Sequence, residues 1–271
     1  MTDDDGATAS ASTRIRVDTG DNSTIFPIGQ DSRVLFIGNS LISFFGPMRD
    51  ALNVVTEAST PSFTYEAGGA GKGLGILLEY ATWPSLNVES IINQGWDIVI
   101  IQPWTDVLEN DLSSYETSAD TLVGWVRASG AYPIFFSPHT AWELWPTEQP
   151  ISRSVIAATA ARLNTGLIEA NAAWNQVLAD YPMTVSDGKL VNTGSNDEFK
   201  DLLYSDNLHQ NANGMALNTY LVYKYLTGKN PEDLDHTAID WPNSMNSIDD
   251  SLQPYFQDVA NEHGTVSPFI D

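Results

Sequence analysis

The chain of 271 residues contains no cysteine, which excludes disulfide bonds, cysteine-ligated zinc and a cysteine nucleophile. Basic residues are scarce as well: 12 Lys and Arg stand against 35 Asp and Glu, for a formal net charge of −23. Because charged residues make up only 17% of the chain, this excess of negative charge comes more from the scarcity of Lys and Arg than from a high content of Asp and Glu. Such a surface repels nucleic acids and anionic membranes, so we expect neither as a partner.

Long apolar runs are missing too. No segment of the sequence approaches the roughly 20 apolar residues that a membrane-spanning helix needs. Residues 1–11 lack the basic region and the apolar core of a signal peptide, so none is visible. The composition suits a protein from a salty habitat or an exported protein, and it leaves both the compartment and the oligomeric state open.

The apolar residues that are present, 42% of the chain, suffice for one sizeable core. Short apolar runs alternate with amphipathic segments, which predicts an α/β fold with a parallel sheet covered by helices on both faces. We expect strands at 34–37, 63–67, 97–101 and 132–136, and helices at 47–57, 74–80, 115–128, 152–178 and 211–226. We further expect a flexible or surface-packed lead at 1–30, a main domain at 31–230 and an extension packed on it at 231–271.

One short segment carries the strongest chemical signal. The apolar run 34–37 is followed by Gly38, Asn39, Ser40 and Leu41, which predicts a strand, a tight turn and a helix start. A serine placed there has its hydroxyl at the carboxyl end of a strand and its amide at a helix N-terminus, which suits a nucleophile beside an oxyanion site. The alternative for Ser40 is a helix N-cap, a position that serine also favours.

A second segment offers a base for such a nucleophile. Asp206 precedes His209 by three residues, and a predicted helix follows directly. A neutral imidazole can accept a serine proton, and a neighbouring carboxylate can hold the ring in the right tautomer. The alternatives are a surface histidine that caps the helix and a solvated loop aspartate.

The two segments together resemble those of the SGNH (GDSL-like) hydrolases. That family places its serine in a Gly-Asp-Ser-Leu block and its Asp and His in an Asp-x-x-His block; here Asn39 stands where the family usually has Asp. The resemblance spans about residues 33–228 and implies a flavodoxin-like, three-layer α/β/α fold. It also implies a catalytic triad of Ser40, His209 and Asp206.

The resemblance further implies an oxyanion hole. Its donors would be the Ser40 amide, a glycine after the second strand and a side-chain amide after the third. Two glycines fit the second position, and we prefer Gly71 over Gly69 because it follows a small residue. The third position usually holds Asn; here Gln102 offers the same N–H donor on a longer arm, as in branches similar to carbohydrate esterases.

Several other residues follow predicted strands and are expected near the same edge of the sheet. His139 is expected to line the substrate site, with a rival role as base or metal ligand; no zinc signature supports the metal. Trp104 and Trp142 are expected to contact substrate, ahead of Trp83 and Trp145, although core packing is the commoner use of tryptophan. The glycine run 68–73 matches neither the P-loop nor the dinucleotide pattern, so we expect no nucleotide and no cofactor.

These residues favour a serine esterase that hydrolyses small acyl esters such as acetyl groups on a carbohydrate, through an acyl-enzyme. Gln102 and the loop tryptophans motivate that substrate class. A lipolytic or aryl esterase for longer acyl chains is the first alternative. A carbohydrate-binding domain that keeps the fold without catalysis is the second.

Overall fold

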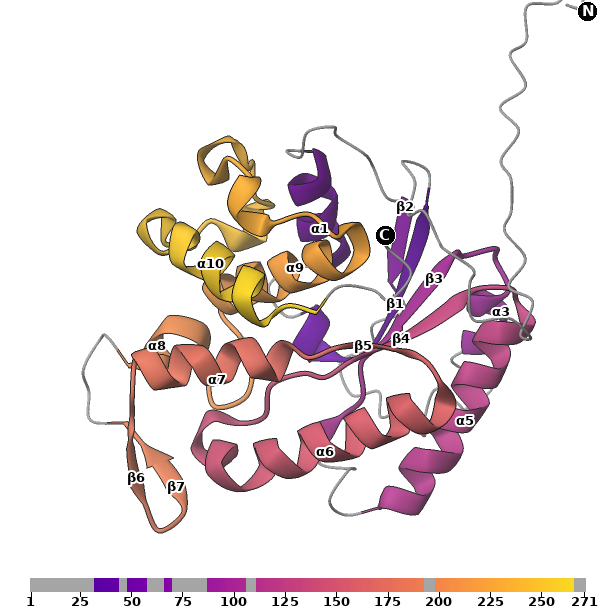
Figure 1. Cartoon of the computed structure of the whole chain (residues 1–271), viewed down its shortest axis with the longest axis horizontal. Coiled ribbons are helices and arrows are strands. Elements are labelled where there is room, and N and C mark those ends of the chain that lie inside the picture. Colours follow the sequence, from indigo (N-terminus) through magenta and orange to yellow (C-terminus); the bar gives the residue numbers. More distant parts are fainter. Residues whose placement is uncertain are drawn as a thin grey trace, which may run out of the picture.

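The computed structural model describes residues 32–43, 48–57, 66–69, 87–105, 111–192 and 198–265 (Figure 1). The expected lead at 1–30 and the expected helix at 74–80 lie outside these residues. The sheet strands are β1 Arg33–Ile37, β2 Glu66–Gly69, β3 Ile98–Ile101, β4 Tyr132–Phe136 and β5 Gly166–Ile168. The helices are α1 Met48–Glu57, α3 Val88–Ile92, α5 Leu112–Ala128, α6 Trp145–Leu163, α7 Ala170–Asp180, α8 Phe199–Leu203, α9 Ala212–Thr227 and α10 Gln253–His263.

The five strands form one parallel sheet in the order β2-β1-β3-β4-β5. The chain passes from β1 to β2 on one side and then returns to place β3 on the other side of β1. The strand order therefore reverses at β1, and in open α/β sheets ligands bind at the carboxyl ends of the strands beside such a reversal. Ser40 follows β1 and Gln102 follows β3, so both lie at this point.

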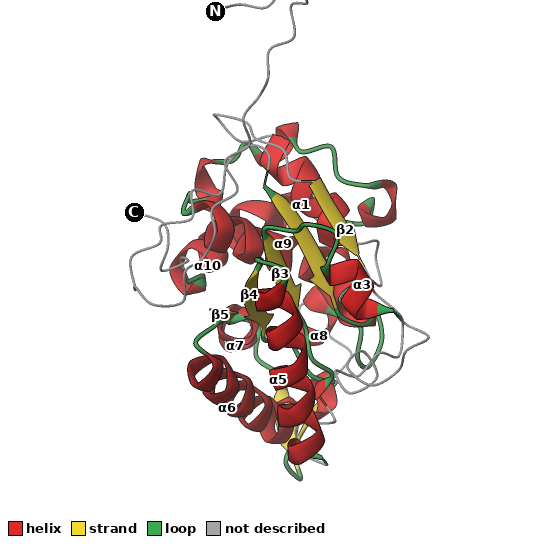
Figure 2. Ribbon diagram, turned by 90° about the vertical axis from the view of Figure 1, so that its right-hand side faces the viewer, coloured by secondary structure: helices red, strands yellow, loops and turns green. Residues whose placement is uncertain are grey.

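Helices cover both faces of the sheet, as Figures 1 and 2 show. Side chains alternate between the faces along each strand. On one face, Val34 and Phe36 of β1 pack in a core with residues of α1, α7, α9 and α10. On the other, Leu35 and Ile37 pack in a core with residues of α3, α5 and α6. This double burial explains why residues 34–37, 98–101 and 133–136 of the inner strands are continuously apolar.

The expected helix at 152–178 is wrong. The chain there forms the end of α6, then β5, then α7. Asn164 adopts a left-handed conformation (φ 51°) and its amide bonds the carbonyls of Ala160 and Ala161, which closes α6. Gly166 then enters the sheet where a β-carbon would lie 2.4 Å from the Tyr225 hydroxyl oxygen. That β-carbon would also lie 2.9 Å from Ile134 Cγ1, so a glycine lets this edge strand pass close to both α9 and β4.

Two further elements escaped the sequence patterns. Strands β6 Thr184–Ser186 and β7 Lys189–Val191 form an antiparallel hairpin whose two turn residues, Asp187 and Gly188, both have positive φ (51° and 75°). Asp-Gly is the pair that such a two-residue turn favours. In the C-terminal segment, α10 packs on α9, and the Tyr220 hydroxyl bonds Gln253 Oε1 at 2.8 Å. No helix among the described residues is long and apolar enough to span a membrane.

Candidate active site

The turn after β1 holds Ser40 in a tightly packed position. A β-carbon on Gly38 would lie 2.5 Å from Ile42 Cδ1 and 2.7 Å from Gln102 Oε1, so this position requires glycine. Ser40 opens a single turn of 3-10 helix that ends at Ile42, and the side chain of Asn39 caps it by accepting from the Leu41 amide at 2.9 Å. Because this helix has only three residues, any support for an oxyanion comes from individual amides and not from a long helix dipole.

Gln102 lies beneath the Ser40 turn. Its Oε1 accepts from the Asn39 amide at 3.0 Å, and its Nε2 donates to the Pro103 carbonyl. A backbone amide can only donate, so the orientation of the Gln102 amide group is determined by Asn39. The side chain is buried. This placement differs from the expected one, because the structure uses Gln102 to hold the turn that carries Ser40.

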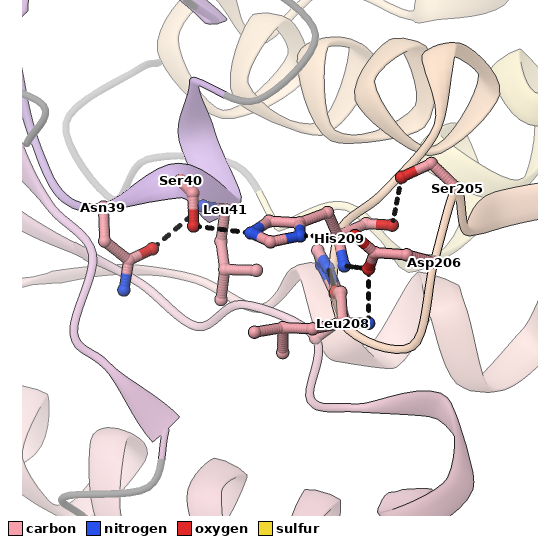
Figure 3. Close-up of polar contacts among 8 residues, drawn as sticks. Asn39, Ser40, Leu41, Ser205, Asp206, Leu208 and His209 are labelled. Carbon is pink, nitrogen blue, oxygen red and sulfur yellow. Dashed lines mark hydrogen bonds and ion pairs between the residues drawn. The ribbon is translucent and has the colours of Figure 1, made fainter. Parts of the chain in front are cut away.

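The sequence-predicted triad comes together across 169 positions of chain (Figure 3). His209 Nε2 lies 2.8 Å from Ser40 Oγ, and His209 Nδ1 lies 2.8 Å from Asp206 Oδ2. An ionised carboxylate can only accept, so Nδ1 carries the ring proton and Nε2 is free to accept from the Ser40 hydroxyl. This is the tautomer that a general base beside a serine needs.

The loop that carries Asp206 and His209 is closed on itself. Asp206 Oδ1 accepts from the amides of Leu208 and His209, each at 2.7 Å. The Ser205 amide donates to the His209 carbonyl at 2.9 Å. Burial raises the pKa of Asp206, but hydrogen bonds from the His209 amide, the His209 ring and the Leu208 amide outweigh it, so this pKa lies below its ordinary value. Asp206 is therefore ionised at neutral pH.

His139 lies behind this loop and not on a surface that a substrate could reach. The side chain is fully buried, and its Nε2 bonds the Leu208 carbonyl at 3.0 Å. Its ring stacks on Trp174, with ring centres 4.1 Å apart. Desolvation lowers the pKa of His139 to about 3, so the ring is neutral at ordinary pH. These contacts replace the substrate-lining role that the sequence predicted with one in support of the loop.

The expected substrate tryptophans have different surroundings. Trp142 is buried and its amide donates to the Asn207 carbonyl at 3.1 Å, and Trp145 packs in the core against Trp174. Trp104, just past the end of β3, is half-buried, and its contact with substrate stays a prediction. Trp83 lies outside the described residues.

The two glycines that fit the oxyanion hole also differ in what the structure says of them. Gly69 ends β2 and pairs in register with Phe36 of β1, whereas Gly71 lies outside the described residues. Within the described part of the chain, no group of three or more His, Asp and Glu side chains is arranged to hold a metal ion.

Sequence reasoning missed the supporting residues of the site. The sequence places Asn39 in the turn, and in the structure its side chain also caps the Ser40 helix by accepting from the Leu41 amide. The Tyr204 hydroxyl bonds the Thr140 carbonyl at 2.7 Å and so ties the loop to the segment after β4. Asn39 could have been found from its position before a helix start, where Asn is a favoured cap. No local signal marks Tyr204.

No protein-family model matches this sequence, and no curated protein matches it. Solved structures do match. A DUF4886 family protein from Bacteroides uniformis is 15% identical, with a TM-score of 0.61 over 88% of this chain and 97% of its own. Axe2, an acetylxylan esterase from Geobacillus stearothermophilus, is 18% identical, with a TM-score of 0.57 over 75% of this chain and 97% of its own. LAE5, an α/β hydrolase enzyme from the metagenome of Lake Arreo, is 16% identical, with a TM-score of 0.54 over 73% of this chain and 95% of its own.

At these identities the likeness shows the fold. The chain has the three-layer α/β/α architecture with a short parallel sheet that these proteins share, which confirms the predicted fold class. The same architecture is the one that the resemblance to SGNH hydrolases implied.

Proposed function

We propose that this protein is a serine esterase that hydrolyses small acyl esters, such as acetyl groups on a carbohydrate, through an acyl-enzyme. One observation carries the proposal: the unbroken chain of hydrogen bonds from Ser40 Oγ through the His209 ring to Asp206, at 2.8 Å for each step. A helix-capping serine or a surface histidine has no need of this arrangement, in which the two residues come from opposite ends of the domain.

The reaction follows from the tautomer. Ser40 Oγ attacks the ester carbonyl carbon while its proton passes to His209 Nε2, and the carbonyl oxygen becomes an oxyanion. His209 returns that proton to the leaving alcohol oxygen as the ester C–O bond breaks, which leaves an acyl group on Ser40. A water molecule then loses a proton to His209 Nε2 and attacks the acyl carbon. The bond between that carbon and Ser40 Oγ breaks as His209 passes the proton to Oγ, which releases the acid and restores the Ser40 hydroxyl. Asp206 stabilises the imidazolium in both halves.

The oxyanion hole is built on the Ser40 amide. As the first residue of a 3-10 helix, Ser40 has no partner for its amide within that helix. The amide of Gly71 stays a prediction. Gln102 supports the hole indirectly, because it holds the Asn39 amide and thereby the peptide that precedes Ser40.

Two observations support the substrate class. Axe2, which is described as an acetylxylan esterase, has the same fold, and Trp104 is half-buried beside the carboxyl end of β3. Tryptophan faces stack on sugars, so a carbohydrate alcohol is the favoured partner of the acyl group. The net charge of −23 disfavours nucleic acid and anionic membranes as partners.

A panel of p-nitrophenyl esters of increasing acyl length, together with acetylated xylose and glucose derivatives, tests the proposal. We expect the highest kcat/KM for acetyl esters and none for Ser40→Ala. Activity that rises with acyl length would favour the lipolytic or aryl esterase. If the wild-type protein hydrolyses nothing and Ser40 does not react with a serine-directed phosphonate, the chain is a non-catalytic domain.

A further inference from the structure

The segment after β4 holds the loop of Asp206 and His209 through three hydrogen bonds. His139 Nε2 bonds the Leu208 carbonyl at 3.0 Å, the Trp142 amide bonds the Asn207 carbonyl at 3.1 Å, and the Tyr204 hydroxyl bonds the Thr140 carbonyl at 2.7 Å. The His139 contact differs from the other two, because its acceptor belongs to the peptide group that joins Leu208 to His209.

That peptide group is held at both of its polar ends. Its carbonyl oxygen accepts from His139 Nε2, and its N–H, which belongs to His209, donates to Asp206 Oδ1 at 2.7 Å. A peptide unit is planar, so two such bonds fix the orientation of the whole plane. The plane fixes the N–Cα bond of His209, and the His209 carbonyl, which accepts from the Ser205 amide at 2.9 Å, restrains rotation about that bond. The two together set the direction in which the side chain leaves the backbone, toward Ser40 Oγ.

The His139 ring has little freedom to do anything else. A carbonyl oxygen only accepts, so Nε2 carries the ring proton. The ring lies flat on Trp174 (4.1 Å, 5° between planes) and edge-on to Tyr204 (5.3 Å, 86°). Its Nδ1 is buried and has no hydrogen-bond partner among the described residues. Such a buried, half-satisfied ring is costly compared with a phenylalanine of similar shape, which argues for a task at the Nε2 end.

We propose that His139 is a positioning residue of the hydrolytic site: it orients the Leu208–His209 peptide so that the His209 imidazole reaches Ser40. This inference rests on the proposed function of the same site. His139 touches no reacting atom and acts only through the loop.

The test compares two substitutions at this position. His139→Phe keeps the stacked ring and removes the donor, and His139→Gln places an amide N–H near the position of Nε2. We expect His139→Phe to lower kcat by about ten- to a hundredfold with KM nearly unchanged, because a small misplacement of a catalytic group has effects of that size. His139→Gln should recover most of the loss. The melting temperature of each variant shows whether it is folded.

A matched control separates positioning from general loosening of the aromatic cluster. Phe199 packs edge-on against Trp174 and Tyr204 and has no described contact with the Leu208–His209 peptide. Phe199→Leu should therefore lower the melting temperature and leave kcat near the wild-type value. If Phe199→Leu and His139→Phe reduce kcat alike, His139 is only a core residue and the proposal fails.

A readout that needs no turnover keeps this inference distinct from the proposed function. In 15N NMR of histidine-labelled protein, His139→Phe should move the His209 Nε2 resonance toward that of a ring without a serine partner, and His139→Gln should move it back. An unchanged His209 signal in folded His139→Phe overturns the positioning role even if the wild type hydrolyses esters. A displaced signal supports it even if no ester substrate is found.

Discussion

Replacement of Asp206 by asparagine should trap His209 in the wrong tautomer. Asp206 Oδ1 accepts from two backbone amides, those of Leu208 and His209, each at 2.7 Å. Because those amides can only donate, the oxygen of the asparagine must take the same place. Its NH2 group is then left facing His209 Nδ1, which must become the acceptor. The ring proton moves to Nε2, the atom that lies 2.8 Å from Ser40 Oγ and should receive the serine proton.

The change of the His209 tautomer sets the expected effects of Asp206→Asn on stability and on kcat. The loop keeps its two amide hydrogen bonds, so the melting temperature should change by only a few degrees. In serine hydrolases the corresponding change of tautomer costs about ten-thousandfold in kcat, and we expect a loss of about a thousand- to ten-thousandfold here, with KM little affected. The assay is steady-state hydrolysis of p-nitrophenyl acetate, alongside thermal unfolding.

A surface aspartate supplies the control. Asp235 also caps its own loop, by accepting from the Thr237 amide at 3.1 Å and the Thr237 hydroxyl at 2.6 Å, but it has no described contact with the triad. Asp235→Asn should leave kcat unchanged. If Asp206→Asn retains kcat within tenfold of the wild type, Asp206 does not set the tautomer, and the reasoning is refuted.

The other predictions concern pH and the residues beneath the site. The kcat/KM for an acetyl ester should fall as pH drops through the range in which histidine titrates, because the base must be neutral; a flat profile from pH 8 to pH 5 would exclude an imidazole base. Gln102→Ala should lower kcat and the melting temperature together, since it leaves the buried Asn39 amide unpaired at a cost of about 1–3 kcal/mol; a lower kcat at an unchanged melting temperature would mean that Gln102 donates directly to the oxyanion. Desolvation lowers the pKa of His139 to about 3, and Asp206 and His209 are the charged groups that act on it. Below about pH 6.5 the unfolded chain therefore binds a proton at this residue, whereas the folded chain does not. This contribution to stability is complete above that pH and is lost as pH falls. The stability advantage of the wild type over His139→Gln in urea should therefore shrink by about 2 kcal/mol between pH 7 and pH 5. An advantage independent of pH would show that burial does not lower the pKa of His139.

Local sequence determined the parts of this protein that depend on near neighbours. The run 34–37 is continuously apolar because both faces of its strand are buried, and Gly38 follows it because no side chain fits against Ile42 and Gln102. The Asp-x-x-His spacing places Asp206 where it caps the amides of its own loop and meets the His209 ring. The contacts of Gly38 with Ile42 and of Asp206 with Leu208 and His209 span at most four residues, so the residue types and their spacing predict them.

Elements that depend on distant partners were missed or misplaced. The stretch 152–178 is rich in alanine on both sides of Asn164-Thr165-Gly166, and these three residues do not by themselves show that a strand follows. The placement of β5 depends on the close approach of Gly166 to Tyr225 and Ile134. The hairpin β6–β7 did carry a local sign, the Asp187-Gly188 turn, but its three-residue strands are too short to show a period.

The tertiary structure alone decided which polar residues near Ser40 face the reaction and which support it. Gln102 and His139 follow neighbouring strands and looked like site residues for the same reason. A strand end places a residue at the edge of the sheet where Ser40 lies, but it does not say whether the side chain turns outward or beneath the loops. The direction of each side chain depends on a hydrogen-bond partner that is distant in the chain. For Gln102 it is the Asn39 amide, 63 positions away, and for His139 it is the Leu208 carbonyl, 69 positions away. A buried polar side chain must find such a partner wherever the fold provides one, and the sequence does not record which backbone groups the fold leaves unpaired.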